Sequence, residues 1–298
     1  MPLRKKSFIQ VPELLINLFF VLVCVFMVVP ILLVISISLS SSDSILNYGY
    51  QLIPHEWSLT AYIYLLESPE VMLRAYGVTI FITVVGTALG LLLTAMMGYG
   101  ISRRDYRYNR ITTLYVFFTM LFSGGLVSTY ILMTQYLHLK NSIWALILPG
   151  LISPFYVMIM KGFMAKIPME IIDSAKIDGA SEWRTFFTII LPLSKPPLAT
   201  LALFISFAYW NEWFNALLYI DNEKMLPLQL LLVRIMNNIE FLTSDSAFIA
   251  GLNINMADFP NDSARMAIAV LTAGPMMVVF PFFQKYFVKG LTVGSLKG

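Results

Sequence analysis

Six long apolar stretches constrain this chain more than any other feature of its sequence. A bilayer core of about 30 Å is crossed by roughly 20 helical residues, and a helix satisfies its own backbone groups where lipid offers no partner. The predicted spans are residues 14–38, 73–101, 111–133, 142–163, 198–220 and 266–288. The sequence therefore predicts an all-α integral membrane protein with six transmembrane helices, forming a single domain over residues 1–298.

The composition excludes most functions of soluble proteins. Hydrophobic residues make up 58% of the chain and charged residues 12%, which is about half the charged share of an ordinary globular protein. The net charge of +3 is too small to provide a phosphate-binding field, so no nucleic-acid partner is expected. His55 and His138 stand apart from other ligand side chains, so the sequence predicts no metal site.

The distribution of Lys and Arg predicts the orientation in the membrane. With the N-terminus inside, fifteen of the 20 Lys and Arg residues lie in the inner segments. The opposite orientation would leave only five inside. Because Lys and Arg are enriched on the cytoplasmic side of membrane proteins, we expect both termini to be cytoplasmic.

Glycine and proline residues mark places where the spans pack closely or bend. Gly86 and Gly90 form a pair at helical spacing that lets another helix approach. The fourth and sixth spans are interrupted by Pro149, Gly150, Pro154, Pro275 and Pro281. Broken helices are common around the cavities of transporters, but ordinary membrane bundles also tolerate them. They favour transport only slightly.

The inner segment 164–197 is much longer than most connections in helical bundles. Pro168 suits the start of a helix, and Gly179 suits its left-handed end. Ser181 is a suitable N-cap for a second helix, which Pro192 would end or kink. The polar face of the first helix is acidic, which argues against a lipid-bound helix. We therefore expect two short helices that meet at a corner and dock on another protein.

The same segment resembles the cytoplasmic signature of ABC-importer permeases: Glu-Ala-Ala, three residues, Gly, nine residues, Ile-x-Leu-Pro. The matching residues are Asp173, Ser174, Ala175, Gly179, Ile189, Leu191 and Pro192. The triplet differs from the pattern in two places, although an acidic and a small residue are kept. Flanking residues 177–180 and 191–196, and the C-terminal stretch 284–298, are typical of the carbohydrate-uptake branch. The resemblance runs from about residue 73 to the end of the chain.

This resemblance implies the type I ABC-importer permease fold, with residues 164–197 as a loop whose coupling helix contacts a separate ATPase. It further implies a second homologous permease, two ATPase subunits, an extracellular solute-binding protein and an oligosaccharide substrate, in a bacterial cell membrane. The chain has no Gly-x-x-x-x-Gly-Lys-[Ser/Thr] motif. It is therefore not expected to be an enzyme, and ATP and Mg would bind to the partner ATPases.

An aromatic and polar run in the fifth span is the candidate substrate pathway. It comprises Tyr209, Trp210, Asn211, Glu212 and Trp213, and resembles the Trp-Asn-Glu pattern of the same permeases. A carboxylate within lipid is costly, so Glu212 should meet a partner, a cavity or water. Flat apolar faces beside hydrogen-bonding groups suit a sugar. A hydrogen bond between subunits and an interfacial Trp belt are the alternatives.

Other interpretations of the whole chain and of two loops remain open. An ion-coupled secondary transporter would show inverted repeats or several intramembrane charges, neither of which is evident. A membrane-embedded enzyme would need convergent catalytic groups. The basic segment 103–107 is interpreted as a topology anchor near anionic lipid, with an ATPase contact as the second possibility. The polar outer stretch 221–265 is placed to meet a solute-binding protein, although loop status explains its composition equally well.

Overall fold

The computed structural model describes residues 11–67, 69–244 and 261–292. Over these ranges the secondary structure is helical apart from one isolated bridge between Ser40 and Trp57, in agreement with the predicted all-α class. The longer helices are α1 (Val11–Ser38), α4 (Pro69–Ser102), α5 (Asn109–Leu121), α8 (Pro154–Met164), α9 (Met169–Ile177), α12 (Lys195–Trp210), α14 (Leu228–Ser244) and α16 (Asn261–Thr292). The shorter ones are α2 (Ser42–Tyr48), α3 (Thr60–Leu65), α6 (Gly125–Ile131), η1 (Leu132–Tyr136), α7 (Trp144–Ile147), η2 (Leu148–Gly150), α10 (Glu182–Thr185), η3 (Phe186–Ile190), α11 (Leu191–Leu193), α13 (Phe214–Tyr219) and η4 (Glu223–Met225).

The chain divides into two compact units. Unit 1 comprises residues 1–68 and 236–273, and unit 2 comprises residues 69–235 and 274–298. In unit 1, the Ser38 hydroxyl lies 2.9 Å from the Tyr62 hydroxyl, which connects the end of α1 to α3. Most of the large apolar side chains of α1 are exposed. An apolar helix of this kind is suited to contact with lipid or another membrane helix.

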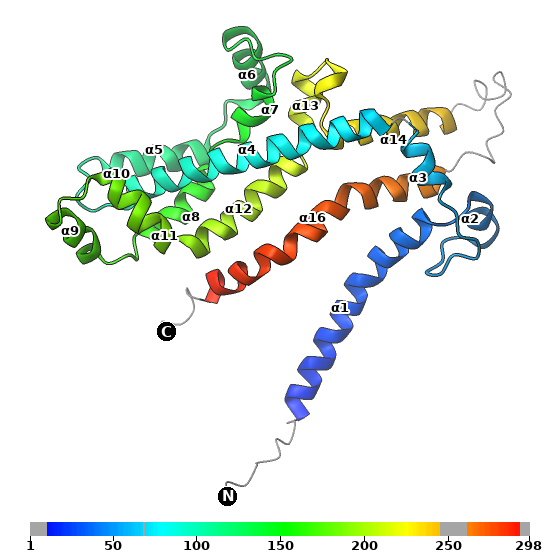
Figure 1. The fold of residues 1–298 in the computed structure, drawn as a ribbon, viewed down its shortest axis with the longest axis horizontal. Helices are drawn as coiled ribbons and strands as arrows, with labels where there is room; N and C mark the ends of the chain where they lie inside the picture. Colours follow the sequence, from blue (N-terminus) through cyan, green and yellow to red (C-terminus); the bar gives the residue numbers. More distant parts are fainter. Residues whose placement is uncertain (1–10, 68, 245–260, 293–298) are drawn as a thin grey trace, which may run out of the picture. The chain divides into compact units, whose positions relative to one another are not determined.

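Unit 2 is built around α4, which lies beside α8 and α12 (Figure 1). Close approach is possible because α4 carries glycine at its contacts. A Cβ atom at Gly86 would fall 2.5 Å from the Tyr209 ring of α12, and one at Gly90 would fall 2.8 Å from the Leu151 carbonyl oxygen. The close approach expected of this glycine pair is therefore present.

Three described helices are each long and apolar enough to cross a membrane: Glu13–Ser38, Pro69–Ser102 and Asp262–Phe282. Three bent pairs extend the number of spans to as many as six. They are Asn109–Leu121 with Gly125–Tyr136, Trp144–Gly150 with Pro154–Met164, and Glu182–Leu193 with Lys195–Trp210. The bends measure 109°, 52° and 82° respectively. The apolar stretches thus correspond to helices, but not all of them are continuous.

The predicted continuous span 111–133 is the largest departure from a straight helix. It breaks between α5 and α6, where Gly125 has a φ of +81° and its N–H donates to the Ser123 hydroxyl at 3.2 Å. Only glycine adopts such a backbone conformation without a steric cost. The proline-containing fourth span bends as its sequence suggests. In contrast, α16 continues through Pro275 and Pro281.

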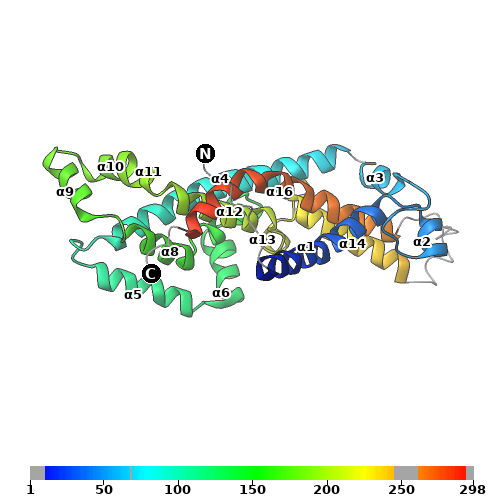
Figure 2. The same ribbon diagram turned by 90° about the horizontal axis from the view of Figure 1, so that it is seen from below.

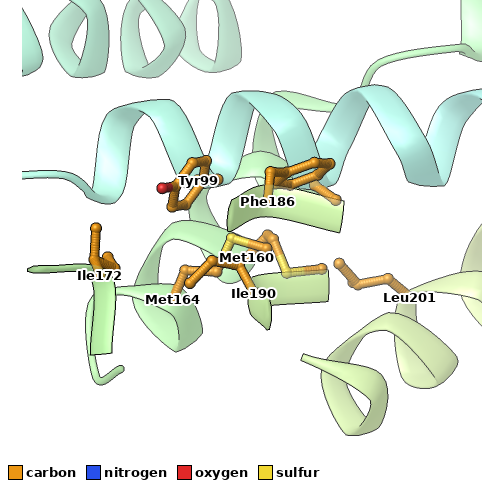
Figure 3. Close-up of a cluster of buried hydrophobic side chains, with 8 residues drawn as sticks. Tyr99, Met160, Met164, Ile172, Phe186, Ile190 and Leu201 are labelled. Carbon is orange, nitrogen blue, oxygen red and sulfur yellow. The ribbon is translucent and has the colours of Figure 1, made fainter. Parts of the chain in front are cut away.

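A buried apolar cluster in unit 2 packs one end of α4 against α8, η3 and α12 (Figure 3). It consists of Ala95, Tyr99, Met160, Met164, Ile172, Phe186, Ile190 and Leu201. Tyr99 of α4 and Phe186 of η3 have ring centroids 5.5 Å apart. Ile172 brings the buried face of α9 into the same cluster. The helices that follow residue 164 are therefore packed onto the end of α4.

Candidate functional site

The corner formed by α9 and α10 has the local structure that its sequence predicts. The helix α9 follows Pro168 and ends with a Schellman motif, in which Ala180 N–H donates to the Ala175 carbonyl at 2.9 Å and Gly179 N–H to the Lys176 carbonyl at 3.0 Å. Gly179 has a φ of +75°. These bonds fix the direction in which the chain leaves α9.

The second helix of the corner starts at the predicted N-cap. The Ser181 hydroxyl accepts a hydrogen bond from Arg184 N–H at 3.3 Å. The chain continues through η3 and α11 and then turns by 82° into α12. Pro192 lies within α11, just before this bend. Both views place α9 and α10 at the end of unit 2 where α4 finishes (Figures 1 and 2).

The residues that match the permease signature differ in their accessibility. Asp173, Ser174, Gly179 and Pro192 are exposed, Ile189 and Leu191 are half-buried, and Ala175 is buried. The exposed polar members, Asp173 and Ser174, therefore share the surface of α9 with the apolar Ile177, whose side chain is 86% exposed. Ala175 lies on the inward face of α9, where its small side chain suits packing within the chain.

Four alternating charges join this corner to the end of α4. Arg103 lies just after α4 and Asp105 two residues later, whereas Lys176 belongs to α9 and Glu182 to α10. Arg103 Nε donates to Asp105 Oδ1 at 2.7 Å, and Arg103 Nη1 donates to Glu182 Oε2 at 2.6 Å. Lys176 Nζ lies 2.9 Å from Asp105 Oδ2 and 3.9 Å from Glu182 Oε1. These four residues form a closed cycle of ion pairs, hereafter the charge ring.

Arg103 is the buried member of the charge ring. Its side chain is 8% exposed, whereas that of Glu182 is 59% exposed. Its Nη1 also donates to the Tyr99 hydroxyl at 2.7 Å, and its guanidinium carbon lies 5.5 Å from the centroid of that ring. Asn109 Nδ2 donates hydrogen bonds to the carbonyl oxygens of Ile101 and Arg103, both at 2.7 Å. Both the side chain and the backbone of Arg103 are thus held in place.

The charge ring stabilises the ionised forms of Arg103 and Asp105. The hydrogen bond from Arg103 lowers the pKa of Asp105 well below its ordinary value, with a further contribution from Lys176. The hydrogen bond to Asp105 raises the pKa of Arg103, and those to Glu182 and Tyr99 act in the same direction. The ring is composed of two basic and two acidic side chains, so their formal charges cancel.

The position of Arg103 differs from the lipid anchor that the sequence suggests. The guanidinium is directed into the chain, while Arg104 and Arg107 remain exposed. Neighbouring arginines look equivalent in the sequence, since nothing local separates a residue that pairs with the chain from one that faces solvent. The sequence gives one indication that this segment pairs within the chain. Asp105 lies in an otherwise basic segment, and the segment 164–197 contains both acidic and basic residues.

The candidate substrate run lies at a break in the predicted fifth span. The helix α12 ends at Trp210, and α13 begins at Phe214. Between them, the Glu212 carboxylate accepts hydrogen bonds from the backbone N–H of Asn215 at 2.7 Å and from its side-chain amide at 2.9 Å. A free N–H at the start of α13 is thereby satisfied. The polar partner expected for Glu212 is thus found in its own chain.

The five residues of this run do not share one environment. Tyr209 is buried and donates to the Ile147 carbonyl at 2.8 Å. Trp210 is also buried, and it lines a groove of about 390 Å³ between α4, α12 and α16 whose walls are almost entirely apolar. Asn211 and Trp213 are exposed. The Asn211 amide donates to the Phe207 carbonyl at 2.9 Å and accepts from Gln229 Nε2 at 3.2 Å. Two aromatic side chains thus support the helix packing, and Trp213 offers an exposed indole.

The stretch 221–265, which the sequence predicts to lie outside, contains more helix than its polar composition suggests. It includes η4, α14 and the first residues of α16, while residues 245–260 fall outside the described part. Asn141, with a φ of +57°, accepts hydrogen bonds from the N–H groups of Asp221 and Asn222 at 2.7 and 3.0 Å. Lys140 Nζ lies 2.9 Å from Asp221 Oδ2. These contacts hold the start of the stretch against the turn before α7.

Among the described residues, no group of three His, Cys, Asp or Glu side chains is arranged to bind a metal ion. The two sites of interest are therefore the α9–α10 corner with its charge ring and the break between α12 and α13. Comparison with known proteins gives these features a family context. A family model described as "Binding-protein-dependent transport system inner membrane component" matches residues 9–293. The chain belongs to this family. The membrane permease family expected from the sequence is thus confirmed.

The permease has close relatives in Bacillus subtilis (strain 168). It is 40% identical over 271 residues to Protein LplC, covering 91% of this chain and 90% of the relative. It is 38% identical over 287 residues to the polygalacturonan/rhamnogalacturonan transport system permease protein YtcP, covering 94% and 95%. A solved bacterial ABC transporter involved in the import of the acidic polysaccharide alginate matches the permease with a TM-score of 0.79 and 25% identity. That match covers 96% of the permease and 100% of the solved chain.

Proposed function

We propose that this permease is a membrane-spanning subunit of an ATP-driven oligosaccharide importer. It would form one half of the translocation pathway, together with a second homologous permease. Two ATPase subunits would act at the cytoplasmic side, and a solute-binding protein would deliver the sugar from outside. ATP and Mg would bind to the ATPases, and the permease would supply the pathway and its movement.

The observation that carries this proposal is the exposed surface of the α9–α10 corner, which combines polar side chains with the apolar Ile177 and Trp183. Asp173 and Ser174 are exposed on a short helix whose C-terminal direction is fixed by the Gly179 turn. A protruding helix of this kind suits a cleft on another protein. The distribution of Lys and Arg predicts that the corner lies in the cytoplasm. The partner of the corner would therefore be the cytoplasmic ATPase. Closure of the ATPase dimer could then rotate the attached helices as a body.

The proposed substrate is an oligosaccharide released from a larger polysaccharide. Support comes from the descriptions of two similar proteins, a polygalacturonan/rhamnogalacturonan transport system permease and a transporter involved in the import of the acidic polysaccharide alginate. Polygalacturonan is, like alginate, a polymer of uronic acids. Short galacturonan fragments are therefore the first substrates to test, with a neutral disaccharide as the comparison.

Within the proposed pathway, Asn211 and Trp213 are the side chains that would contact the sugar. The exposed indole of Trp213 suits the apolar face of a sugar ring. The Asn211 amide would contact a sugar hydroxyl in place of its exposed hydrogen bond with Gln229. Glu212 would act indirectly by holding the start of α13, and Tyr209 and Trp210 by packing α12. The apolar groove beside Trp210 offers a sugar few hydrogen-bonding partners. The pathway is thus assigned to the exposed side of the break.

A labelling experiment tests the orientation. Cys24 is the only cysteine of the chain, so Cys24→Ala gives a cysteine-free background. In that background, Ser174→Cys should react with a membrane-impermeant maleimide in inverted vesicles but not in intact cells. Lys140→Cys, in an outer segment of the predicted topology, should show the reverse. Labelling of Ser174→Cys from outside would contradict the proposed contact with the ATPase.

A reconstituted complex tests the transport activity. The permease should purify with a second permease and ATPase subunits, and galacturonan fragments with their binding protein should stimulate ATP hydrolysis. Uptake should persist in the presence of a proton uncoupler and stop when ATP is removed. Uptake that stops with the uncoupler instead would favour the ion-coupled transporter. A permease that transports alone would refute the proposal.

The roles within the pathway can be separated by two substitutions at Glu212. Glu212→Gln keeps an oxygen that can accept from Asn215, so uptake should remain near the original level if Glu212 only supports α13. Glu212→Ala removes both acceptors and should reduce uptake. Trp213→Ala should reduce uptake without affecting assembly. Unchanged uptake in Trp213→Ala would exclude Trp213 from the pathway.

A further inference from the structure

The charge ring joins two regions that are distant in sequence, the end of α4 and the α9–α10 corner. Arg103 and Glu182 are separated by 79 positions, and Asp105 and Lys176 by 71. One end of each pair follows α4, and the other belongs to α9 or α10. Both helices of the corner are therefore attached to the same end of α4. Each attachment is a directional ion pair in addition to the apolar packing below it.

The burial of Arg103 makes this attachment stiff. A charged group that is withdrawn from water depends on its partners, because separating it from them leaves an unpaired buried charge. With its side chain 8% exposed, Arg103 has hydrogen bonds to Asp105, Glu182 and Tyr99. Sliding the corner along α4 would break these bonds together. Apolar contacts alone would allow small sliding movements at lower cost, because they are not directional.

A second point on α4, ten residues after its start at Pro69, is also attached to a distant segment. The Thr79 hydroxyl, which is buried, accepts a hydrogen bond from the Leu228 N–H at 2.8 Å, where α14 begins. From Thr79 to Arg103 a helix rises about 36 Å at 1.5 Å per residue, comparable to the thickness of a bilayer core. No proline lies inside α4. A movement imposed at the charge ring can therefore be carried along α4 as a rigid element.

We propose that Arg103 is the positioning residue that makes α4 move with the α9–α10 corner. It acts through Asp105 and Glu182, and it contacts neither substrate nor nucleotide. This inference rests on the proposed function, because it assumes that a partner ATPase moves the corner. When the ATPase dimer closes, α9 and α10 rotate, the charge ring carries the rotation into α4, and α4 carries it across the membrane. Without Arg103 the corner moves while α4 lags behind.

The test uses the complete reconstituted complex. Arg103→Ala should lower galacturonan-fragment uptake at least tenfold, while ATP hydrolysis continues within about twofold of the original rate. The sugar transported per ATP hydrolysed should fall accordingly, which a merely weaker complex would not cause. Arg104→Ala is the matched control, since Arg104 is the adjacent exposed arginine and takes part in none of the ion pairs of the described residues. It should transport normally.

A second measurement follows α4 directly. Gly77 lies near Thr79, is exposed, and has open space around a Cβ atom, so Gly77→Cys should accept a spin label in the Cys24→Ala background. ATP should change the mobility of this label when Arg103 is present. The change should disappear in Arg103→Ala and persist in Arg104→Ala. Loss of the spectral change would show that movement no longer reaches the far end of α4.

The outcomes separate this inference from the proposed function. If the unsubstituted complex shows no ATP-driven uptake, the proposed function fails. If it transports, and Arg103→Ala transports as much sugar per ATP as the original, the role of Arg103 is wrong while the function stands. Should Arg103→Ala not assemble, Glu182→Gln removes one charge of the ring from an exposed position and should lower sugar per ATP. Failure of both variants to assemble, or normal coupling in Glu182→Gln, would overturn the inference.

Discussion

Two contacts fix α4 to its neighbours by different physical means. Halfway along the helix, Gly86 lies against the Tyr209 ring, and the Tyr209 hydroxyl reaches the Ile147 carbonyl at 2.8 Å. At its end, Arg103 is held by the charge ring. The first contact is uncharged and depends on the absence of a side chain. The second depends on opposite charges that are partly open to water.

The difference follows from the surroundings of each contact. Within a bilayer, apolar side chains gain nothing by leaving lipid, so helices associate through close packing at small residues and through hydrogen bonds. At the end of a helix, water competes for polar groups, and a persistent contact needs several ion pairs with one buried member. The middle of α4 is thus positioned by shape, and its end is positioned by charge in addition to the apolar cluster around Tyr99. Each contact should respond to a different kind of substitution.

The largest expected effect comes from filling the glycine contact. Gly86→Ala places a Cβ atom 2.5 Å from the Tyr209 ring, so the ring or α12 must move. Overpacking of this kind costs about 1–3 kcal/mol, which exceeds the gain of up to about 1 kcal/mol from replacing glycine by alanine in a helix. The apparent melting temperature of the detergent-solubilised permease, followed by size-exclusion chromatography, should fall by several degrees.

Gly77→Ala is the matched control for this substitution. Gly77 lies on the same helix, and nothing lies within 4 Å of a Cβ atom placed there. The same change should therefore leave the melting temperature unchanged or raise it. If Gly86→Ala and Gly77→Ala behave alike, the middle of α4 is not positioned by shape.

Local structure was predictable wherever a few neighbouring residues determine it. Pro168, Gly179 and Ser181 specify the start of α9, its left-handed end and the N-cap of α10, and the structure contains all three features. Each depends on bonds within about one helical turn, which sequence spacing describes directly. The Gly86 and Gly90 pair likewise predicts a close helix contact. The partners, Tyr209 for Gly86 and Leu151 for Gly90, could not be named because they lie far away in the sequence.

The missed features depend on direction and on tertiary pairing. Hydropathy counts apolar residues in 111–133 but does not report the direction of the chain, so the 109° bend before Gly125 was not predicted. The sequence treats Arg103 and Arg104 alike, although one is buried in the charge ring and the other is exposed. For Glu212, the need for a polar partner was correctly expected. That Asn215 supplies it became clear only from the break between α12 and α13.

A smaller effect is expected from removing the hydrogen bond at the uncharged contact. Tyr209→Phe keeps the ring against Gly86 and removes only the bond to the Ile147 carbonyl. Interhelical hydrogen bonds in membrane proteins contribute about 0.6 kcal/mol on average, so the melting temperature should fall by one or two degrees. Tyr156→Phe is the control, because the Tyr156 ring stacks on Phe204 and its hydroxyl has no hydrogen bond within the described residues. If the melting temperature of Tyr209→Phe falls as far as that of Gly86→Ala, the contact between α4 and α12 depends on the hydrogen bond and not on close packing.

The smallest effect distinguishes the two contacts by pH. Because Arg103, and then Lys176, lower the pKa of Asp105, the folded protein favours the ionised carboxylate. The pKa of Asp105 in the unfolded chain is about 3.9. The stability that Asp105 contributes is therefore present above this pH, and it is lost as the pH falls through the lower pKa of Asp105 in the folded protein. For a partly exposed pair it amounts to no more than about 1 kcal/mol. The difference in melting temperature between the original chain and Asp105→Asn should be constant from pH 7 to 5 and shrink below pH 4.

High salt should also reduce this difference, because ions screen exposed charges. The difference between the original chain and Tyr209→Phe should respond to neither pH nor salt over the same range, since the tyrosine hydroxyl and the Ile147 carbonyl are both uncharged. If the Asp105→Asn difference stays constant down to pH 3 and in high salt, Asp105 contributes by packing and not by charge. The end of α4 would then be positioned by shape, as its middle is, and the contrast between the two contacts would disappear.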